Sequence, residues 1–128
     1  RVLAPGKRRG TCRVCGREGY VPESGPALCA DCRLEPGDLA TDRETGDCVV
    51  VVRVTGAAAE DVPVTGAGVS VADYHTNEGY PRDDPVVEVV YPFGGDPEVP
   101  LAERRRYSFP HSRLLPRDEA LVDADLVA

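Results

Sequence analysis

The clearest apolar run in the chain lies at residues 48–55 and reads C-V-V-V-V-R-V-T. Valine is β-branched and favours extended backbone, and four valines in succession suit a strand that is buried on both faces. Residues 86–93 alternate instead and predict a second strand, with Glu88 facing one way. The other face of this strand is expected to carry Val87, Val89, Tyr91 and Phe93.

Two weaker patterns predict further strands. Residues 68–74 alternate between apolar and polar positions. Residues 104–109, R-R-R-Y-S-F, are expected to turn Tyr107 and Phe109 inward before Pro110 ends the strand. All these strands are short, separated by turns and joined without long helices, so we expect a small antiparallel sheet or an SH3-like barrel.

These patterns divide the chain into segments and make it mostly β. A polar, turn-rich stretch at residues 36–47 is expected to be a linker between two modules. The expected segments are a basic arm at 1–10, a cysteine-rich module at 11–35, this linker, an antiparallel β domain at 48–116 and an acidic tail or short helix at 117–128.

Two C-x-x-C pairs, Cys12/Cys15 and Cys29/Cys32, precede the β domain. Two residues between cysteines let one tight turn aim both sulfurs at the same point, and Gly16 lets the backbone fold beneath them. Four thiolates at this spacing suit one tetrahedral zinc ion with no open position, which makes the zinc structural rather than catalytic.

Other readings of the cysteines stay open at this point. Two disulfides or a thioredoxin-like redox pair would use the same residues, but a reducing compartment and the lack of a βαβ pattern argue against them. The fifth cysteine, Cys48, is expected to be a small buried residue, with a thiol that exchanges into the metal site as the alternative.

The paired cysteines, with Gly16 after the first pair, resemble the zinc ribbon family over about residues 10–34. The resemblance implies that each pair sits at the tip of a β-hairpin. A treble clef would instead start a helix at the second pair, but Pro36 and Gly37 would stop that helix almost at once. Residues 71–91 and 106–114 look like segments of small haloarchaeal zinc-ribbon proteins, which implies lineage and architecture only.

The composition indicates an acidic, water-exposed protein. The chain has 128 residues and a formal net charge of −7, with Lys7 as its single lysine beside fourteen arginines. Such a composition suggests a halophilic archaeon with a high-GC genome, or else an ordinary acidic protein of a high-GC bacterium. The sequence shows no run of the about 18 apolar residues that a membrane span needs and no signal peptide, so we expect a cytoplasmic protein. Methionine is absent, and we expect a trimmed chain.

Charge is unevenly divided and points to an anionic partner. Residues 1–33 carry seven basic and three acidic side chains, a difference of +4, whereas residues 34–128 carry eight and nineteen, a difference of −11. Basic side chains contact phosphate, so the first hypothesis is RNA or DNA binding. The candidate contacts are Lys7, Arg8, Arg9, Arg13, Arg17, Arg33, Arg104, Arg105 and Arg106. Aromatic residues that would stack on bases, or else fill the core, are Tyr74, Tyr80, Tyr91, Tyr107 and Phe109.

Two other functions are compatible with the sequence. The chain could be an adaptor whose zinc ribbon docks on a larger protein complex while the acidic body stays solvated. A weaker alternative is a small hydrolase built on the loop from Asp73 to Asp84, although no known catalytic spacing is present. Its candidate groups are Asp73, His75, Glu78, Asp83, Asp84 and His111. We therefore expect a non-catalytic protein.

Overall fold

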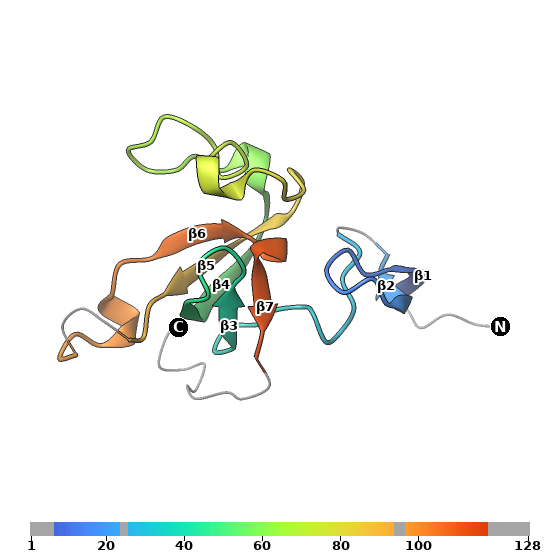
Figure 1. Ribbon diagram of the computed structural model, residues 1–128, viewed down its shortest axis with the longest axis horizontal. Coiled ribbons are helices and arrows are strands. Elements are labelled where there is room, and N and C mark those ends of the chain that lie inside the picture. The colour runs from blue at the N-terminus through green and yellow to red at the C-terminus, as the bar shows by residue number, and fades with distance from the viewer. Residues whose placement is uncertain (1–6, 24–25, 94–96, 118–128) are drawn as a thin grey trace. The chain divides into compact units, whose positions relative to one another are not determined.

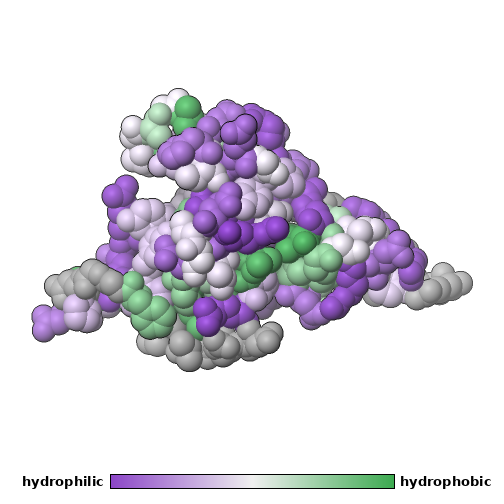
Figure 2. All heavy atoms as spheres, in the orientation of Figure 1, coloured by the Kyte–Doolittle hydropathy of each residue, from purple (hydrophilic) through white to green (hydrophobic). Residues whose placement is uncertain are grey.

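The protein consists of two compact β units. The computed structural model describes residues 7–23, 26–93 and 97–117, and contacts between residues divide the chain at Arg33 and Leu34 (Figure 1). Within those described ranges, all regular structure is β-strand or 3-10 helix, and no helix is long and apolar enough to cross a membrane. The visible surface is mainly hydrophilic, with hydrophobic patches between (Figure 2).

The first unit is built on an antiparallel hairpin. Strand β1 (Lys7–Thr11) pairs with β2 (Glu18–Pro22), so that Arg9 lies opposite Tyr20. Residues 7–10, which the sequence analysis assigned to a basic arm, are therefore part of the sheet. Their backbone N–H and C=O groups form hydrogen bonds with β2, whereas those of a free arm would bond to water.

The second unit is an open antiparallel sheet with the strand order β6-β5-β4-β3-β7. This confirms the prediction of a small antiparallel sheet. Of the two outer strands, β7 has three residues and is the shortest of this sheet, and β6 has four, as many as β3; the outer strands end in proline, at Pro110 and Pro116. The strands are β3 (Leu39–Asp42), β4 (Cys48–Ala58), β5 (Pro85–Val90), β6 (Tyr107–Pro110) and β7 (Leu114–Pro116). Four 3-10 turns connect them: η1 (Ala59–Asp61), η2 (His75–Asn77), η3 (Leu101–Glu103) and η4 (His111–Arg113).

The central strand β4 is buried on both faces, as its valine run predicts. Val49 and Val51 join a cluster with Leu114 on one face, while Val50 and Val52 join a cluster with Leu39 on the other. None of the four valines is more than 5% exposed. Alternate residues of a strand point to opposite faces, so this single run supplies side chains to both clusters.

Some predicted elements differ from the structure. Residues 36–47 contain β3, because the short segment L-A-T-D pairs with β4 on one side and β7 on the other. Residues 68–74 form turns with one isolated bridge rather than a strand, since Asp73 and Ser70 hydrogen-bond to each other and close a turn there. Phe93 lies beyond the end of β5 and is 68% exposed.

Two further predictions concern the C-terminal part of the chain. Strand β6 begins only at Tyr107, so Arg104, Arg105 and Arg106 precede it rather than forming its first half. Phe109 is buried, whereas Tyr107 remains 38% exposed and does not point fully inward. The short helix or tail expected at the end of the chain lies outside the described residues from position 118 onward.

Candidate metal centre

Four cysteines meet at the tip of the β1–β2 hairpin. Cys12 directly follows β1, and its backbone N–H donates to the carbonyl of Arg17 at 2.9 Å. Gly16, with φ +77°, donates its N–H to the carbonyl of Cys12 at 3.0 Å and closes the turn that carries the first pair. Only glycine adopts this left-handed backbone at no steric cost, as the sequence predicted for the residue after the first pair.

The second pair forms a similar turn on the segment after β2. The backbone N–H groups of Cys32 and Arg33 both donate to the carbonyl of Cys29 at 3.1 Å. A further hydrogen bond of 2.7 Å runs from the Arg13 N–H to the carbonyl of Ala27 and ties the two turns together. Local backbone bonds thus place all four side chains around one point.

The sulfur positions fit a single tetrahedral ion. The ligand atoms of Cys12, Cys15, Cys29 and Cys32 all lie within 4.8 Å of one another, and the Cys15 and Cys29 Sγ atoms are 3.8 Å apart. A Zn–S bond of about 2.3 Å gives a tetrahedron whose edge is about 3.8 Å. A disulfide needs about 2.05 Å, and all four cysteines are free thiols here, so the covalent alternatives do not describe this site.

The pKa values of two of the thiols are shifted in opposite directions. Burial raises the pKa of the Cys12 thiol, but hydrogen bonds from the backbone N–H groups of Cys15, Cys29 and Val14 outweigh it and lower that pKa to about 6. Burial, followed by hydrogen bonds with the other sulfurs, raises the pKa of Cys32. A divalent cation would remove this conflict, because a shared positive charge takes the place of the protons.

Arg17 lies beside the sulfurs. Its backbone N–H lies 3.4 Å from the Cys15 Sγ, and its guanidinium pairs with Asp31 at 2.5 Å. Asp31 first, and the charges of Cys15 and Cys29 second, raise the pKa of Arg17. The guanidinium therefore lies within electrostatic range of the cysteine cluster, as expected for a residue that offsets thiolate charge.

The other predicted basic contacts belong to both units. Arg8 and Arg9 are exposed on opposite faces of β1, and Arg9 lies 5.6 Å from the ring centroid of Tyr20. Arg104 donates to the backbone carbonyls of Tyr91, Pro92 and Val99 at 2.8 to 3.1 Å. Arg105 lies over Tyr107, and Arg106 is 3.5 Å from Glu88. The triplet thus serves three different local purposes.

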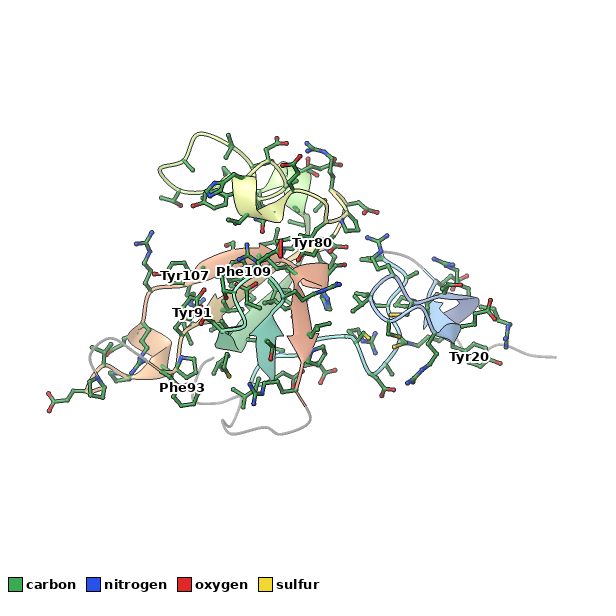
Figure 3. The ribbon with its side chains drawn as sticks, viewed as in Figure 1. Tyr20, Tyr80, Tyr91, Phe93, Tyr107 and Phe109 are labelled. Carbon is green, nitrogen blue, oxygen red and sulfur yellow. The ribbon has the colours of Figure 1, made fainter. Side chains whose placement is uncertain are left out.

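Tyr20 is a surface residue that the sequence analysis did not select. It is 38% exposed and lies on the hairpin of the first unit, where Figure 3 labels it. Its position opposite Arg9 could have been found from the sequence, because K-x-R at residues 7–9 and Y-x-P at residues 20–22 place these side chains on one face of a short hairpin.

Several candidate residues of the hydrolase hypothesis make local hydrogen bonds or ring contacts. Asp73 accepts from Arg82 at 2.6 Å and from Ser70 at 3.1 Å, and these bonds lower its pKa, Arg82 most strongly. The exposed His75 ring packs against Tyr74 with centroids 4.7 Å apart. Asp84 is fully buried and accepts from the backbone N–H of Ser112 at 2.7 Å.

A buried polar network, which the sequence did not reveal, holds the loops of the second unit. Arg113 donates two hydrogen bonds of 2.8 Å to Asp42, and further bonds to Asn77 and Thr76. The guanidinium carbon also lies 4.4 Å from the Phe109 ring centroid. Next to it, the His111 Nε2 accepts from the backbone N–H of Leu34 at 3.1 Å. The segment P-H-S-R is therefore structural.

Comparison with family models, with curated proteins and with solved structures gives no match to this chain. The structure itself defines the class. A four-cysteine group that could hold one metal ion lies in a β-hairpin region, consistent with a zinc ribbon, and an open five-stranded antiparallel sheet follows it.

Proposed function

We propose that this chain is a non-catalytic zinc-ribbon protein that binds single-stranded RNA or DNA through the first unit. The four cysteines would hold one structural Zn²⁺, because four thiolates leave no position for water or substrate. In this role the metal fixes the two turns, and with them the hairpin that presents the binding face.

The observation that supports this proposal is the pairing of Arg9 with Tyr20 on the exposed face of the hairpin. Alternation along β1 puts Lys7 on the same face as Arg9. A cationic side chain beside an exposed aromatic ring suits a single strand, whose phosphates meet the charge while a base stacks on the ring. Neither contact needs a particular base.

The distribution of charge also favours nucleic-acid binding by the first unit. Residues 1–33 have a difference of +4 between basic and acidic side chains. Zinc with four thiolates carries about −2, so the first unit keeps a net charge of about +2. The remainder carries −11, and a polyanion is therefore drawn to the hairpin and repelled by the sheet.

The binding experiment compares two variants with one control by fluorescence anisotropy on a short labelled single strand. Arg9→Ala should lower the salt dependence by about 0.7 in the slope of log K against log salt, the value for one phosphate contact on a single strand. Tyr20→Ala should cost about 1 to 3 kcal/mol, the range for one stacked base. Arg82→Ala, an exposed arginine of the second unit, should change neither.

The same experiment can refute the proposal. Absence of binding at low salt, or equal losses for Arg9→Ala and Arg82→Ala, would show that the hairpin face is not a nucleic-acid site.

Metal content tests the zinc centre independently. The purified protein should contain one zinc per chain by elemental analysis, lost in Cys29→Ser and kept in Cys48→Ser. Cys48 provides a matched control because it lies in β4 and packs against the Leu39 cluster of the sheet. Retention of zinc by Cys29→Ser would contradict the assignment.

A further inference from the structure

The second unit carries an open groove of about 700 Å³ close to the end of β5 and the start of β6. Three aromatic rings line it, together with charged side chains from neighbouring loops. These lining residues include Tyr91, Phe93, Tyr107, Asp47, Glu103 and Arg105. The volume lies within the range of about 300 to 1,000 Å³ that is typical of binding sites.

Two of the three rings, those of Phe93 and Tyr107, are exposed, whereas Tyr91 packs against the core. Phe93 is 68% exposed and Tyr107 is 38% exposed, whereas Phe109 on the same strand as Tyr107 is 8% exposed. Figure 3 shows Tyr107, Tyr91 and Phe93 in succession along one side of the sheet. Exposed apolar residues gathered at one place mark contact surfaces more often than scattered ones do.

The groove is held in shape before any ligand arrives. Tyr91 and Tyr107 pack edge to face with ring centroids 5.1 Å apart. Arg104 donates to the carbonyls of Tyr91, Pro92 and Val99, and so fixes the backbone on both sides of the intervening loop. A ligand therefore meets two rings, Tyr91 and Tyr107, that are already positioned, which lowers the entropy cost of binding.

Charge disfavours a phosphate ligand at this place. The lining carboxylates of Asp47 and Glu103 balance Arg104 and Arg105, and the guanidinium of Arg104 is already bonded to three carbonyls. Burial first, and the carboxylates of Asp42 and Asp47 after it, raise the pKa of Tyr91, and Asp47 also lines the groove. The −11 charge of residues 34–128 acts in the same direction.

We infer that this aromatic groove binds an extended, proline-containing peptide segment that carries an arginine or lysine. Prolines in the polyproline II conformation pack flat against aromatic rings, and this conformation is largely formed before binding. Tyrosine hydroxyl groups donate to the exposed carbonyls of such a segment. The cationic residue pairs with the carboxylate of Asp47 or of Glu103, both of which line the groove.

This binding is separate from the proposed contact of the first unit with nucleic acid. The chain would then join a peptide-bearing partner at its acidic sheet to a nucleic acid at its basic hairpin.

The test uses the full zinc-loaded chain and a labelled synthetic peptide with a Pro-x-x-Pro core and one flanking arginine. Phe93→Ala should weaken binding about tenfold or more, the scale of a central aromatic contact. Its side chain is exposed, so the variant should fold normally. Tyr20→Ala is the matched aromatic control, because Tyr20 has the same 38% exposure as Tyr107 and lies on the other unit. It should leave peptide binding unchanged.

A double variant tests the contribution of the two carboxylates to peptide binding. Asp47→Asn combined with Glu103→Gln should weaken binding of the arginine peptide, but leave a peptide with norleucine in place of the arginine unaffected.

Several outcomes would overturn the inference. They are a lack of saturable peptide binding, equal binding by Phe93→Ala and the unaltered chain, and equal binding of the peptide whose prolines are replaced by alanine. A single-stranded oligonucleotide whose affinity falls in Phe93→Ala and not in Tyr20→Ala would also overturn it, since the groove would then be a platform for bases. Loss of nucleic-acid binding in Tyr20→Ala alone concerns the hairpin and leaves this inference intact.

Discussion

Removal of Arg113 should destabilise the second unit severely. Arg113 is 4% exposed and Asp42 is fully buried, so Arg113→Ala leaves a carboxylate in the interior without its cation. It also deletes the hydrogen bonds to Asn77 and Thr76 and the contact with the Phe109 ring. Breaking a buried ion pair from one side costs about 3 to 5 kcal/mol. That is a large part of the about 5 to 15 kcal/mol that holds a domain folded.

The assay is thermal and urea unfolding at neutral pH, followed by far-UV circular dichroism. For a domain of this size, each kcal/mol moves Tm by about 4 to 8 °C, so Tm should fall by about 12 to 40 °C. Arg82→Ala is the matched control, because its ion pairs with Asp73 and Glu60 are half exposed and should contribute little to stability.

A double variant separates the charge from the shape of the side chain. Asp42→Asn combined with Arg113→Met removes both charges and should be more stable than Arg113→Ala alone, because no unpaired ion remains inside. If Arg113→Ala unfolds at the same temperature as Arg82→Ala, the buried network does not hold the loops, and the reasoning above is wrong.

Three further outcomes follow from the structure. Burial raises the pKa of Asp42, but hydrogen bonds, above all the one from Arg113, lower that pKa below its ordinary value of 3.8. The stability that the Asp42 carboxylate contributes is complete above pH 3.8 and is lost as the pH falls through the lowered pKa. Asp42→Asn should therefore make the unfolding of the second unit in acid less dependent on pH. Leu114→Ala should cost about 2 to 5 kcal/mol in urea unfolding because Leu114 is fully buried, whereas Leu115→Ala, 39% exposed, should stay within about 0.5 kcal/mol; similar values for the two would contradict the sheet register. Chelation of zinc should abolish amide protection in the hairpin, while hydrogen exchange of β4 should remain slow, since the sheet has its own core.

Much of the fold could be predicted from local patterns in the sequence. The valine run at residues 49–52 predicted a strand buried on both faces, because alternation alone sends such a run to two sides of a sheet. The C-x-x-C spacing predicted the cysteine cluster, because each pair acts within one turn. In both cases the physical cause lies within a few residues of the pattern.

The elements that the sequence missed depend on distant partners. Residues 39–42 form a strand because β4 and β7 lie on either side of them, and nothing in L-A-T-D favours one strongly. Arg113 and Asp42 are 71 positions apart in the chain, so no spacing rule joins them. The alternation at residues 68–74 was misleading, because the hydrogen bonds of Ser70 with Asp73 favour a turn over an isolated strand.

The prolines that end the outer strands of the sheet have a consequence for solubility. A flat valine-rich strand left at the rim of a sheet is a template on which other chains add and fibres grow. Here the valine-rich strand β4 lies in the middle of the sheet. The edge strands are short and end at Pro110 and Pro116, which have no N–H group that could donate to an added strand. Short outer strands that end in proline therefore disfavour the addition of another strand to this valine-rich sheet.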